Sequence, residues 1–267
     1  MDKCLLGSTE IAVSRLGLGT VKLGRNTAIK YPHDFKIPDD KAASYLLSFA
    51  KDLGINLLDT APAYGNSEER LGKLLQGERQ DWVLVSKAGE EFDGMQSTYN
   101  FSANSIIASI KRSLQRLQTD YLDVLLIHSN GEDQKIIEQE QVFETLARLK
   151  KEGLIRAYGM STKTLLGGLL TVSEADVVMV TCHPGYEEEV PVISVAKQKN
   201  KGVLIKKAFA SGHLSGFAEQ GQDPIKNAMR FIFGYPGVTS VITGTINPDH
   251  LQQNYTAVKE ALFFASY

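Results

Sequence analysis

Eight short apolar runs, each separated from the next by a longer segment of helical periodicity, constrain the fold more than any other feature. Each run has the length of a strand and is apolar enough to be buried on both faces. Strands that alternate with helices in this way predict parallel pairing through right-handed crossovers. The runs are residues 14–20, 54–60, 81–87, 121–128, 155–161, 176–183, 202–207 and 240–244.

Four of the intervening segments carry recognisable helix boundaries. Ser102 is placed to cap a helix over 102–118, and Gly153 is placed to end one over 138–153. Asp223 and Asn247 each precede a proline, as an N-cap residue often does. These boundaries support the helical interpretation of the spacers.

Closing eight strand-helix units predicts an α/β fold, a (β/α)₈ TIM barrel, and 267 residues suit one barrel domain over 1–267. An open doubly wound sheet is the structural alternative. It is disfavoured because the first turn, "LGLGTVKLG", lacks the G-x-G-x-x-G spacing of a dinucleotide fold. The preceding stretch, "KCLLGSTEIAVSRLG", predicts an N-terminal β-hairpin that caps the barrel bottom.

Charge and cysteine content exclude several classes of partner. The net charge is −2 and the lysines and arginines are scattered, so we expect no nucleic-acid partner. Two cysteines are too few for a four-cysteine zinc site, and no metal ligands are proposed. The N-terminus lacks the apolar core of a signal peptide, and no run could span a bilayer. We therefore expect no membrane partner and a cytoplasmic location.

Ionisable residues close three successive strand runs. Asp59 ends the second run, Lys87 the third and His128 the fourth, while Tyr64 follows Asp59 in a loop. Ligands bind at the C-terminal ends of barrel strands, so all four side chains can reach one mouth. Singly, each has an ordinary structural explanation: a helix cap, a solvated lysine, a core histidine, a loop aromatic. Together on adjacent strands they favour a catalytic site.

This set supports proton transfer to a carbonyl oxygen. A phenol has a pKa of about 10, and we expect the Lys87 ammonium to lower that of Tyr64. Asp59 would hold Lys87 charged, which explains why a carboxylate ends an apolar strand. His128 could orient a substrate carbonyl by a hydrogen bond. Reduction follows if a hydride reaches the carbonyl carbon.

Several long segments in the same order resemble the aldo-keto reductase superfamily, whose members are (β/α)₈ barrels. They include "KCLLGSTEIAVSRLGLGT", "DTAPAYGNSEERLGKLL", the segment from Ser97 to His128, and "VITGTINPDHLQQN". The resemblance implies that Asp59, Tyr64, Lys87 and His128 form the catalytic tetrad, with Tyr64 as general acid. It also implies an enzyme that uses NADP(H) or, less often, NAD(H).

The resemblance further implies cofactor contacts at the ends of several strands. Gly19 and Thr20 match the first-strand contact. Ser161, Thr162 and Met179 fall where the family binds the nicotinamide carboxamide, but without its usual amide side chains. The other implied cofactor contacts are Asp59, Lys206, Lys207, Phe209, Ser211, Gly212, Gly244, Thr245, His250, Gln253 and Asn254.

Two departures from the family pattern concern the cofactor. Lys206 replaces the aromatic residue or arginine that covers the nicotinamide ring. Gly244 and His250 stand where many relatives have the lysine or arginine that selects NADP(H) over NAD(H). NADP(H) is the expected cofactor, with NAD(H) as the alternative.

The expected substrate is a small carbonyl compound, contacted by Tyr64, His128 and Val21. Short loops predict a shallow, open pocket with broad aldehyde and ketone acceptance, in a monomer or weak oligomer. Two alternatives stay open: a Schiff-base aldolase using Lys87 or Lys206, and a nucleotide-binding regulatory protein of the same fold.

Overall fold

A computed structural model describes residues 1–29, 31–214 and 221–265. In it eight parallel strands close into a barrel, in the order β10-β11-β12-β3-β4-β5-β8-β9 with β9 pairing back to β10. The predicted barrel is confirmed and the open sheet is excluded. The barrel strands are β3 (Leu16–Gly19), β4 (Leu57–Asp59), β5 (Val83–Ala88), β8 (Leu122–His128), β9 (Ile155–Ser161), β10 (Val177–Thr181), β11 (Gly202–Lys206) and β12 (Ser240–Thr243).

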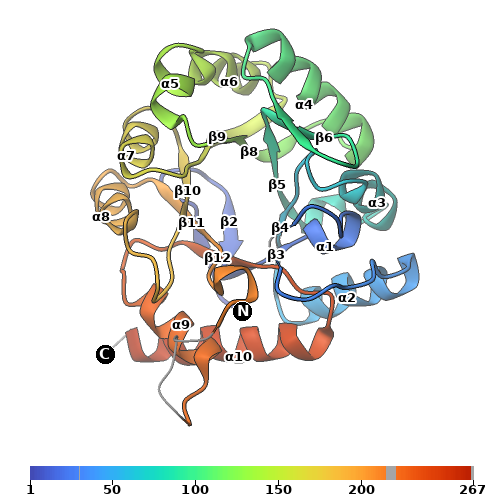
Figure 1. Cartoon of the computed structure of the whole chain (residues 1–267), viewed down its shortest axis with the longest axis vertical. Helices are drawn as coiled ribbons and strands as arrows, with labels where there is room; N and C mark the ends of the chain where they lie inside the picture. The colour runs from blue at the N-terminus through green and yellow to red at the C-terminus, as the bar shows by residue number, and fades with distance from the viewer. Residues whose placement is uncertain (30, 215–220, 266–267) are drawn as a thin grey trace.

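Helices form a ring around the strands (Figure 1). Among the described residues, no helix combines the length and the apolar character needed to cross a bilayer. The helices are α1 (Val21–Gly24), α2 (Asp40–Asp52), α3 (Ser67–Leu74), α4 (Ala103–Leu117), α5 (Asp133–Glu138), α6 (Val142–Lys151), α7 (Leu165–Glu174), α8 (Val190–Gln198), α9 (Pro224–Phe233) and α10 (Pro248–Ala265), with 3₁₀ turns at Arg79–Asp81 and Ala210–Gly212.

The three predicted N-caps and the helix end at Gly153 are confirmed, whereas the predicted start of that helix at residue 138 is wrong, because α5 ends at Glu138 and α6 begins at Val142. Ser102 Oγ accepts from the amide of the third residue after it at the start of α4. The Asp223 carboxylate accepts from two amides of α9, and Asn247 Oδ1 accepts from the Asp249 amide at the start of α10. Gly153, after α6, has a φ of 79°, a conformation that glycine adopts without strain.

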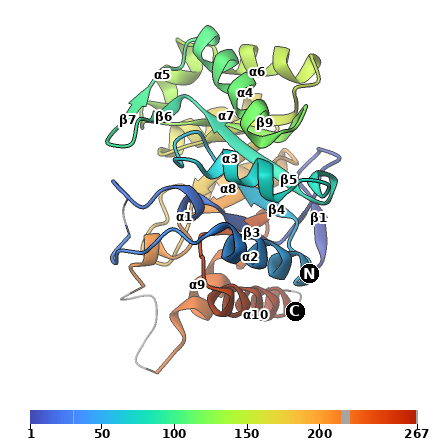
Figure 2. The ribbon, with the colours of Figure 1, turned by 90° about the vertical axis from the view of Figure 1, so that its right-hand side faces the viewer.

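An antiparallel hairpin of β1 (Lys3–Leu5) and β2 (Ala12–Ser14) closes one end of the barrel, as predicted. Leu6, Ile11 and Val13 are at most 2% exposed and pack against side chains inside the barrel. Figure 2 shows β1 on the side of the molecule opposite to β6 and β7. The open mouth therefore lies at the other end, where the strands finish.

Side-chain alternation along the strands directs the ionisable side chains at the strand ends into this mouth. Leu57, Val85 and Leu126 belong to the cluster inside the barrel, whereas Leu58 and Leu84 belong to the outer core beneath the helices. Because strand residues alternate between faces, the position two residues beyond each inward apolar side chain also points inward. On β4, β5, β8 and β11 those positions are Asp59, Lys87, His128 and Lys206.

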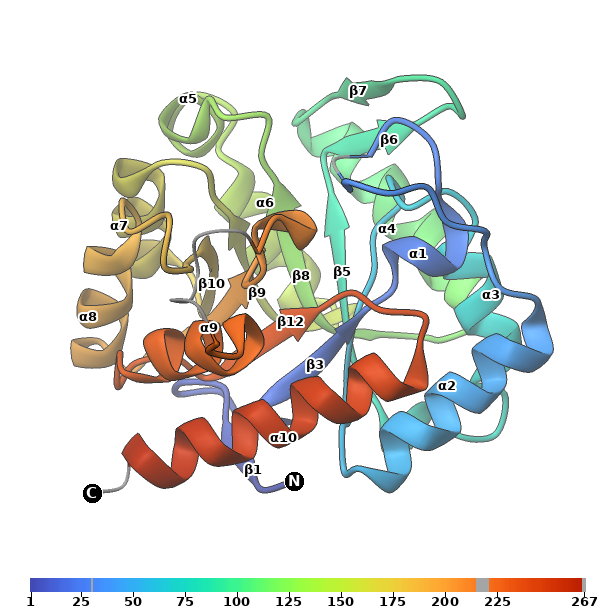
Figure 3. The same ribbon diagram turned by 60° about the horizontal axis from the view of Figure 1, so that its bottom comes forward.

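A second hairpin, β6 (Glu90–Phe92) and β7 (Ser97–Tyr99), rises at the mouth and was not predicted. Figure 3 shows it at the opposite end of the molecule from β1. Its strands are short and polar, so they lack the apolar alternation by which a strand is recognised. The Arg25 guanidinium lies 3.5 Å from the Phe92 ring centroid and ties the hairpin to the segment after α1.

Candidate active site

Lys87 donates hydrogen bonds to two of the other three predicted catalytic residues. Its Nζ donates to Asp59 Oδ1 at 2.6 Å, to the Thr60 carbonyl at 3.0 Å and to Tyr64 Oη at 3.2 Å. Lys87 is 2% exposed and Asp59 is 4% exposed. The strand-end carboxylate is thus compensated by a buried ammonium, as the sequence predicts.

The hydroxyl proton of Tyr64 is directed by the same arrangement. An ammonium has only protons to offer, so Tyr64 Oη accepts from Lys87 and its own O–H is available to another acceptor. Tyr64 lines a cavity of about 240 Å³, together with Lys87 and His128. The Tyr64 and His128 rings meet edge to face, with centroids 6.2 Å apart. A substrate oxygen in this cavity can meet both rings.

The predicted pKa of Tyr64 is wrong in direction. Burial raises the pKa of Tyr64 well above its ordinary value, and the Asp59 carboxylate adds to the rise. These effects outweigh the lowering expected from Lys87. Tyr64 therefore holds its proton at neutral pH, which suits a proton donor in the direction of carbonyl reduction.

His128 has an acidic partner that the sequence did not indicate. Its Nδ1 lies 2.8 Å from Oε2 of Glu90, the first residue of β6. Burial lowers the pKa of His128, and Glu90 opposes this by favouring the imidazolium. No local sequence pattern indicates this partner, because Glu90 lies in an unpredicted hairpin far from His128 along the chain.

The loop that carries Tyr64 is fixed by close backbone packing. Arg25 Nη1 donates to the Ala63 carbonyl at 2.8 Å, directly before Tyr64. A Cβ added at Gly24 would lie 2.3 Å from the Tyr64 carbonyl oxygen, so this approach requires glycine. Ser67 Oγ donates to Thr20 Oγ1 at 2.8 Å below the loop. The phenol is therefore held on a rigid support.

Two adjoining cavities contain nearly all the predicted cofactor and substrate residues. We call the one at the tetrad the tetrad cavity and the other, of about 420 Å³, the adjoining cavity. The predicted residues of the tetrad cavity are Gly19, Val21, Asp59, Tyr64, Lys87, His128, Ser161, Met179, Lys206, Lys207, Ser211 and Gly244. Those of the adjoining cavity are Lys207, Phe209, Ser211, Gly212, Gly244, Thr245, His250, Gln253 and Asn254.

Thr20 and Thr162 line neither cavity. The Thr20 hydroxyl donates to the Asp59 carbonyl at 3.0 Å, and Thr162 Oγ1 donates to Oε1 of the buried Glu189 at 2.7 Å. Both hydroxyls thus support the strand ends. That either side chain contacts the cofactor stays a prediction. These hydrogen bonds argue against it, because both hydroxyls already donate to other groups.

Lys206 brings a second ammonium into the tetrad cavity. Its Nζ donates to Ser161 Oγ at 3.0 Å and also to the Thr162 carbonyl. Burial lowers the pKa of Lys206 to about 8, although Glu189 partly opposes this. Ser161 and Lys206 therefore offer polar atoms where the resemblance places the nicotinamide carboxamide.

The segment between α1 and α2 supplies cavity walls that the sequence did not predict. Tyr31 lines both cavities, and Pro32 and His33 line the adjoining one. Lys22 Nζ lies 4.1 Å from the Tyr31 ring centroid and 5.0 Å from that of Phe35. This segment has neither helical nor strand periodicity, so only the tertiary structure reveals its place.

Comparisons with known proteins identify the family of this barrel. The family model described as "Aldo/keto reductase family" matches residues 15–227. A Pseudomonas aeruginosa protein described as an aldo-keto reductase has a solved structure with 50% identity and a TM-score of 0.88, over 97% of this chain and 95% of that one.

Two curated relatives are more distant. L-galactose dehydrogenase of Arabidopsis thaliana is 29% identical over 96% of this chain and 87% of its own length. The NADH-specific methylglyoxal reductase of Escherichia coli is 35% identical over 60% of this chain and 51% of its own length. These are oxidoreductases, and the family uses nicotinamide cofactors. With the closed barrel and the family match over most of its length, the chain belongs to the aldo/keto reductase family.

Proposed function

We propose that the protein reduces aldehyde and ketone carbonyls to alcohols with hydride from a nicotinamide nucleotide, and that Tyr64 donates the proton. One observation carries the proposal: buried Lys87 donates to both Asp59 and Tyr64 Oη, and the phenol borders a cavity. Because Lys87 can only donate, the phenol keeps its own proton, and Tyr64 can give that proton to an oxygen in the cavity.

The chain's residues fit an elongated dinucleotide. The tetrad cavity and the adjoining cavity share Tyr31, Lys207 and Gly244, so they form one continuous path. A Cβ added at Gly244 would lie 3.1 Å from Tyr31 Oη, so glycine keeps this path open. Ser211 and Gly212 have φ values of 59° and 98°, a left-handed turn of the kind that forms anion-binding backbone concavities.

Each part of the path has a proposed role. Ser161, Met179 and Lys206 would hold the nicotinamide end, and residues 207–212 the pyrophosphate. The adenosine end would contact Thr245, His250, Gln253 and Asn254, and the bound nucleotide would supply the hydride. His128 orients the carbonyl oxygen, and Tyr64 Oη gives its proton to that oxygen as negative charge develops there.

We propose NADP(H) as the working cofactor, with NAD(H) accepted as well. Residues 244–254 contain no lysine or arginine that could clamp a 2′-phosphate. Lys22 and Lys207 are the lysines that line the adjoining cavity in the described part of the chain. A hydrogen bond to a charged group contributes about 1.5–3 kcal/mol. Without a dedicated clamp, we expect the two affinities to differ by about tenfold or less.

Nucleotide titration followed by turnover tests the proposal. NADPH and NADH are titrated into the protein by fluorescence, and oxidation is then followed with methylglyoxal, simple aldehydes, ketones and aldoses. We expect saturable binding and loss of the nicotinamide absorbance with several small carbonyls. Absence of nucleotide binding would overturn the proposal. Turnover of a single sugar class alone would overturn the broad acceptance expected of the pocket.

Lys206 is expected to make nucleotide binding depend on pH. Its pKa is about 8, so its ammonium loses charge as the pH rises through 8. Nucleotide affinity should fall over that range in the unmodified protein. Lys206→Met should bind nucleotide more weakly below pH 8, and its affinity should not fall as the pH rises through 8. Lys206→Arg stays charged and should also lack the fall, while keeping more affinity. Identical pH profiles in all three would contradict a contact to the nucleotide.

A Schiff-base aldolase is the second candidate, because Lys206 has a lowered pKa inside the tetrad cavity. Its neutral amine would attack a carbonyl carbon and release water to form the imine. Borohydride would then trap a covalent adduct on the unmodified protein but not on Lys206→Met. Nucleotide oxidation without any adduct would exclude this candidate.

A further inference from the structure

Glu90 approaches His128 so closely that one of the two groups must carry a proton. Oε2 of Glu90 lies 2.8 Å from Nδ1 of His128, and their side chains are 12% and 19% exposed. A carboxylate oxygen and an unprotonated ring nitrogen are both acceptors, and they would repel each other at that distance. One of the two groups therefore carries a proton.

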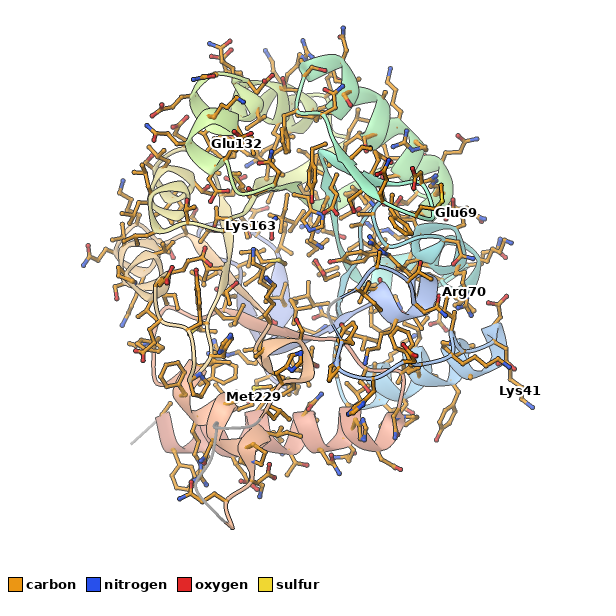
Figure 4. All side chains as sticks on the ribbon, in the orientation of Figure 1. Lys41, Glu69, Arg70, Glu132, Lys163 and Met229 are labelled. Atoms are coloured by element: carbon orange, nitrogen blue, oxygen red, sulfur yellow. The ribbon has the colours of Figure 1, made fainter. Side chains whose placement is uncertain are left out.

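The proton belongs to the imidazole. Burial raises the pKa of Glu90, but contacts with His128, Ser97 and Lys163 outweigh it and bring that pKa to about 2. Lys163 comes from the segment between β9 and α7 and is labelled in Figure 4. Glu90 is therefore a carboxylate, and Nδ1 of His128 is protonated. In the neutral ring this leaves Nε2 as an acceptor, which cannot donate to a carbonyl oxygen.

We propose that Glu90 is the positioning residue of His128: it fixes the proton on Nδ1 and stabilises the imidazolium, whose Nε2–H then donates to the substrate oxygen. This inference rests on the proposed carbonyl reduction, because it names the partner that makes His128 a hydrogen-bond donor. Glu90 acts through His128 and does not itself need to touch substrate.

The charges around His128 show in which direction the loss of the Glu90 charge would change the pKa of the imidazole. Burial lowers the pKa of His128, and the charges of Lys87 on β5 and Lys206 on β11 lower it further. The Glu90 carboxylate opposes them and raises it. Removing the Glu90 charge must therefore lower the pKa of His128 further, so the imidazolium would be lost at a lower pH.

Three neighbouring side chains interact with the Glu90 carboxylate. Arg25 attracts the Glu90 carboxylate, and Tyr99 and Tyr64 are kept in their neutral form by it. Tyr99 is on β7 of the same hairpin as Glu90, and the Arg25 guanidinium lies over the ring of Phe92 on β6. These neighbours do not replace the Glu90 charge, because none of them is a carboxylate beside Nδ1.

The hairpin holds Glu90 in a defined place and supplies a matched control. Gly89 has a φ of 103°, and a Cβ added there would lie 2.5 Å from the Phe101 ring, so the residue directly before Glu90 must be glycine. The next residue, Glu91, faces away: its Oε1 accepts from Ser109 Oγ at 2.9 Å and pairs with Arg112. Glu91→Gln removes a charge from the same strand without touching His128.

The experiment compares Glu90→Gln with Glu91→Gln in the full chain. Glutamine has nearly the same size and shape as glutamate, so the first variant removes the charge beside Nδ1 and keeps the packing of the side chain. Nitrogen NMR of the His128 ring in the nucleotide-free protein gives its protonation state and pKa. Steady-state turnover with NADPH and a small aldehyde gives the pH profile of kcat.

We expect Glu91→Gln to match the unmodified protein in both measurements. Glu90→Gln should lower the imidazole pKa, move the alkaline limb of kcat to lower pH, and reduce kcat at neutral pH by about tenfold or more. Glu90→Asp keeps a negative charge, so the alkaline limb of its kcat profile should shift less than that of Glu90→Gln. An imidazole titration and kcat profile in Glu90→Gln like those of Glu91→Gln would overturn the inference.

The two measurements also separate this inference from the proposed function. If the unmodified protein reduces no carbonyl, the proposed function fails. The ring titration still reports whether Glu90 governs the protonation of His128. If carbonyls are reduced but the titration is insensitive to Glu90, the function stands and the positioning role is overturned.

Discussion

Tyr64→Phe is expected to slow carbonyl reduction by about 10²–10⁴-fold while leaving nucleotide affinity within about twofold, because positioned proton transfer contributes a factor of that size. The phenylalanine ring keeps the packing against His128, whose ring centroid is 6.2 Å away, and loses only the hydroxyl. Single-turnover mixing of the nucleotide-loaded protein with a small aldehyde measures the chemical step directly.

The matched control for Tyr64→Phe is Tyr31→Phe. Tyr31 also lines the tetrad cavity, and burial raises its pKa too, but it has no hydrogen bond to Lys87 among those that Lys87 makes. Tyr31→Phe should therefore keep most of the rate of carbonyl reduction. Equal rates in Tyr64→Phe and the unmodified protein would contradict the role of Tyr64 and favour a nucleotide-binding regulatory protein.

Lys87→Met is expected to lower the free energy of unfolding by about 3–5 kcal/mol and to abolish most turnover. Methionine fills similar volume but leaves the Asp59 carboxylate buried at 4% exposure without its ammonium. The Tyr64 oxygen also loses the donor that fixes its orientation. Chemical denaturation measures the stability, and the same aldehyde assay measures the rate.

The double variant Lys87→Met, Asp59→Asn separates the two effects. Removing both charges leaves no unpaired buried ion, so stability should recover by about 2 kcal/mol or more relative to Lys87→Met. Activity should not recover, because the donor to Tyr64 is still absent. Recovery of turnover with stability would mean that the pair serves the fold alone.

The barrel could be predicted from the sequence because its signal is local and repeated. The run "GINLLDT" predicts β4, and its apolar residues show which side chains enter the barrel. Asp59, Lys87 and His128 follow inward apolar positions by two residues, so strand alternation alone brings them together. The pairing of Lys87 with Asp59 then follows from the cost of an unpaired buried charge.

The remaining features depend on contacts between segments that the sequence does not relate. Glu90 reaches His128 from a polar hairpin, and Tyr31 reaches Gly244 from an irregular segment. The pKa of Tyr64 rises because the mouth is enclosed on several sides, whereas the sequence indicated only its one favourable neighbour. Thr162 turns its hydroxyl to the buried Glu189, which lies 27 residues further along the chain.

Isotope transfer tests the central claim most directly. The protein is given nicotinamide nucleotide deuterated at the transferable ring position, together with a small aldehyde, and the alcohol is analysed by mass spectrometry. The account predicts one deuterium on the carbinol carbon, formed quickly by the unmodified protein and far more slowly by Tyr64→Phe. An alcohol without deuterium, or a labelled alcohol formed equally fast by both proteins, would contradict hydride transfer coupled to the Tyr64 proton.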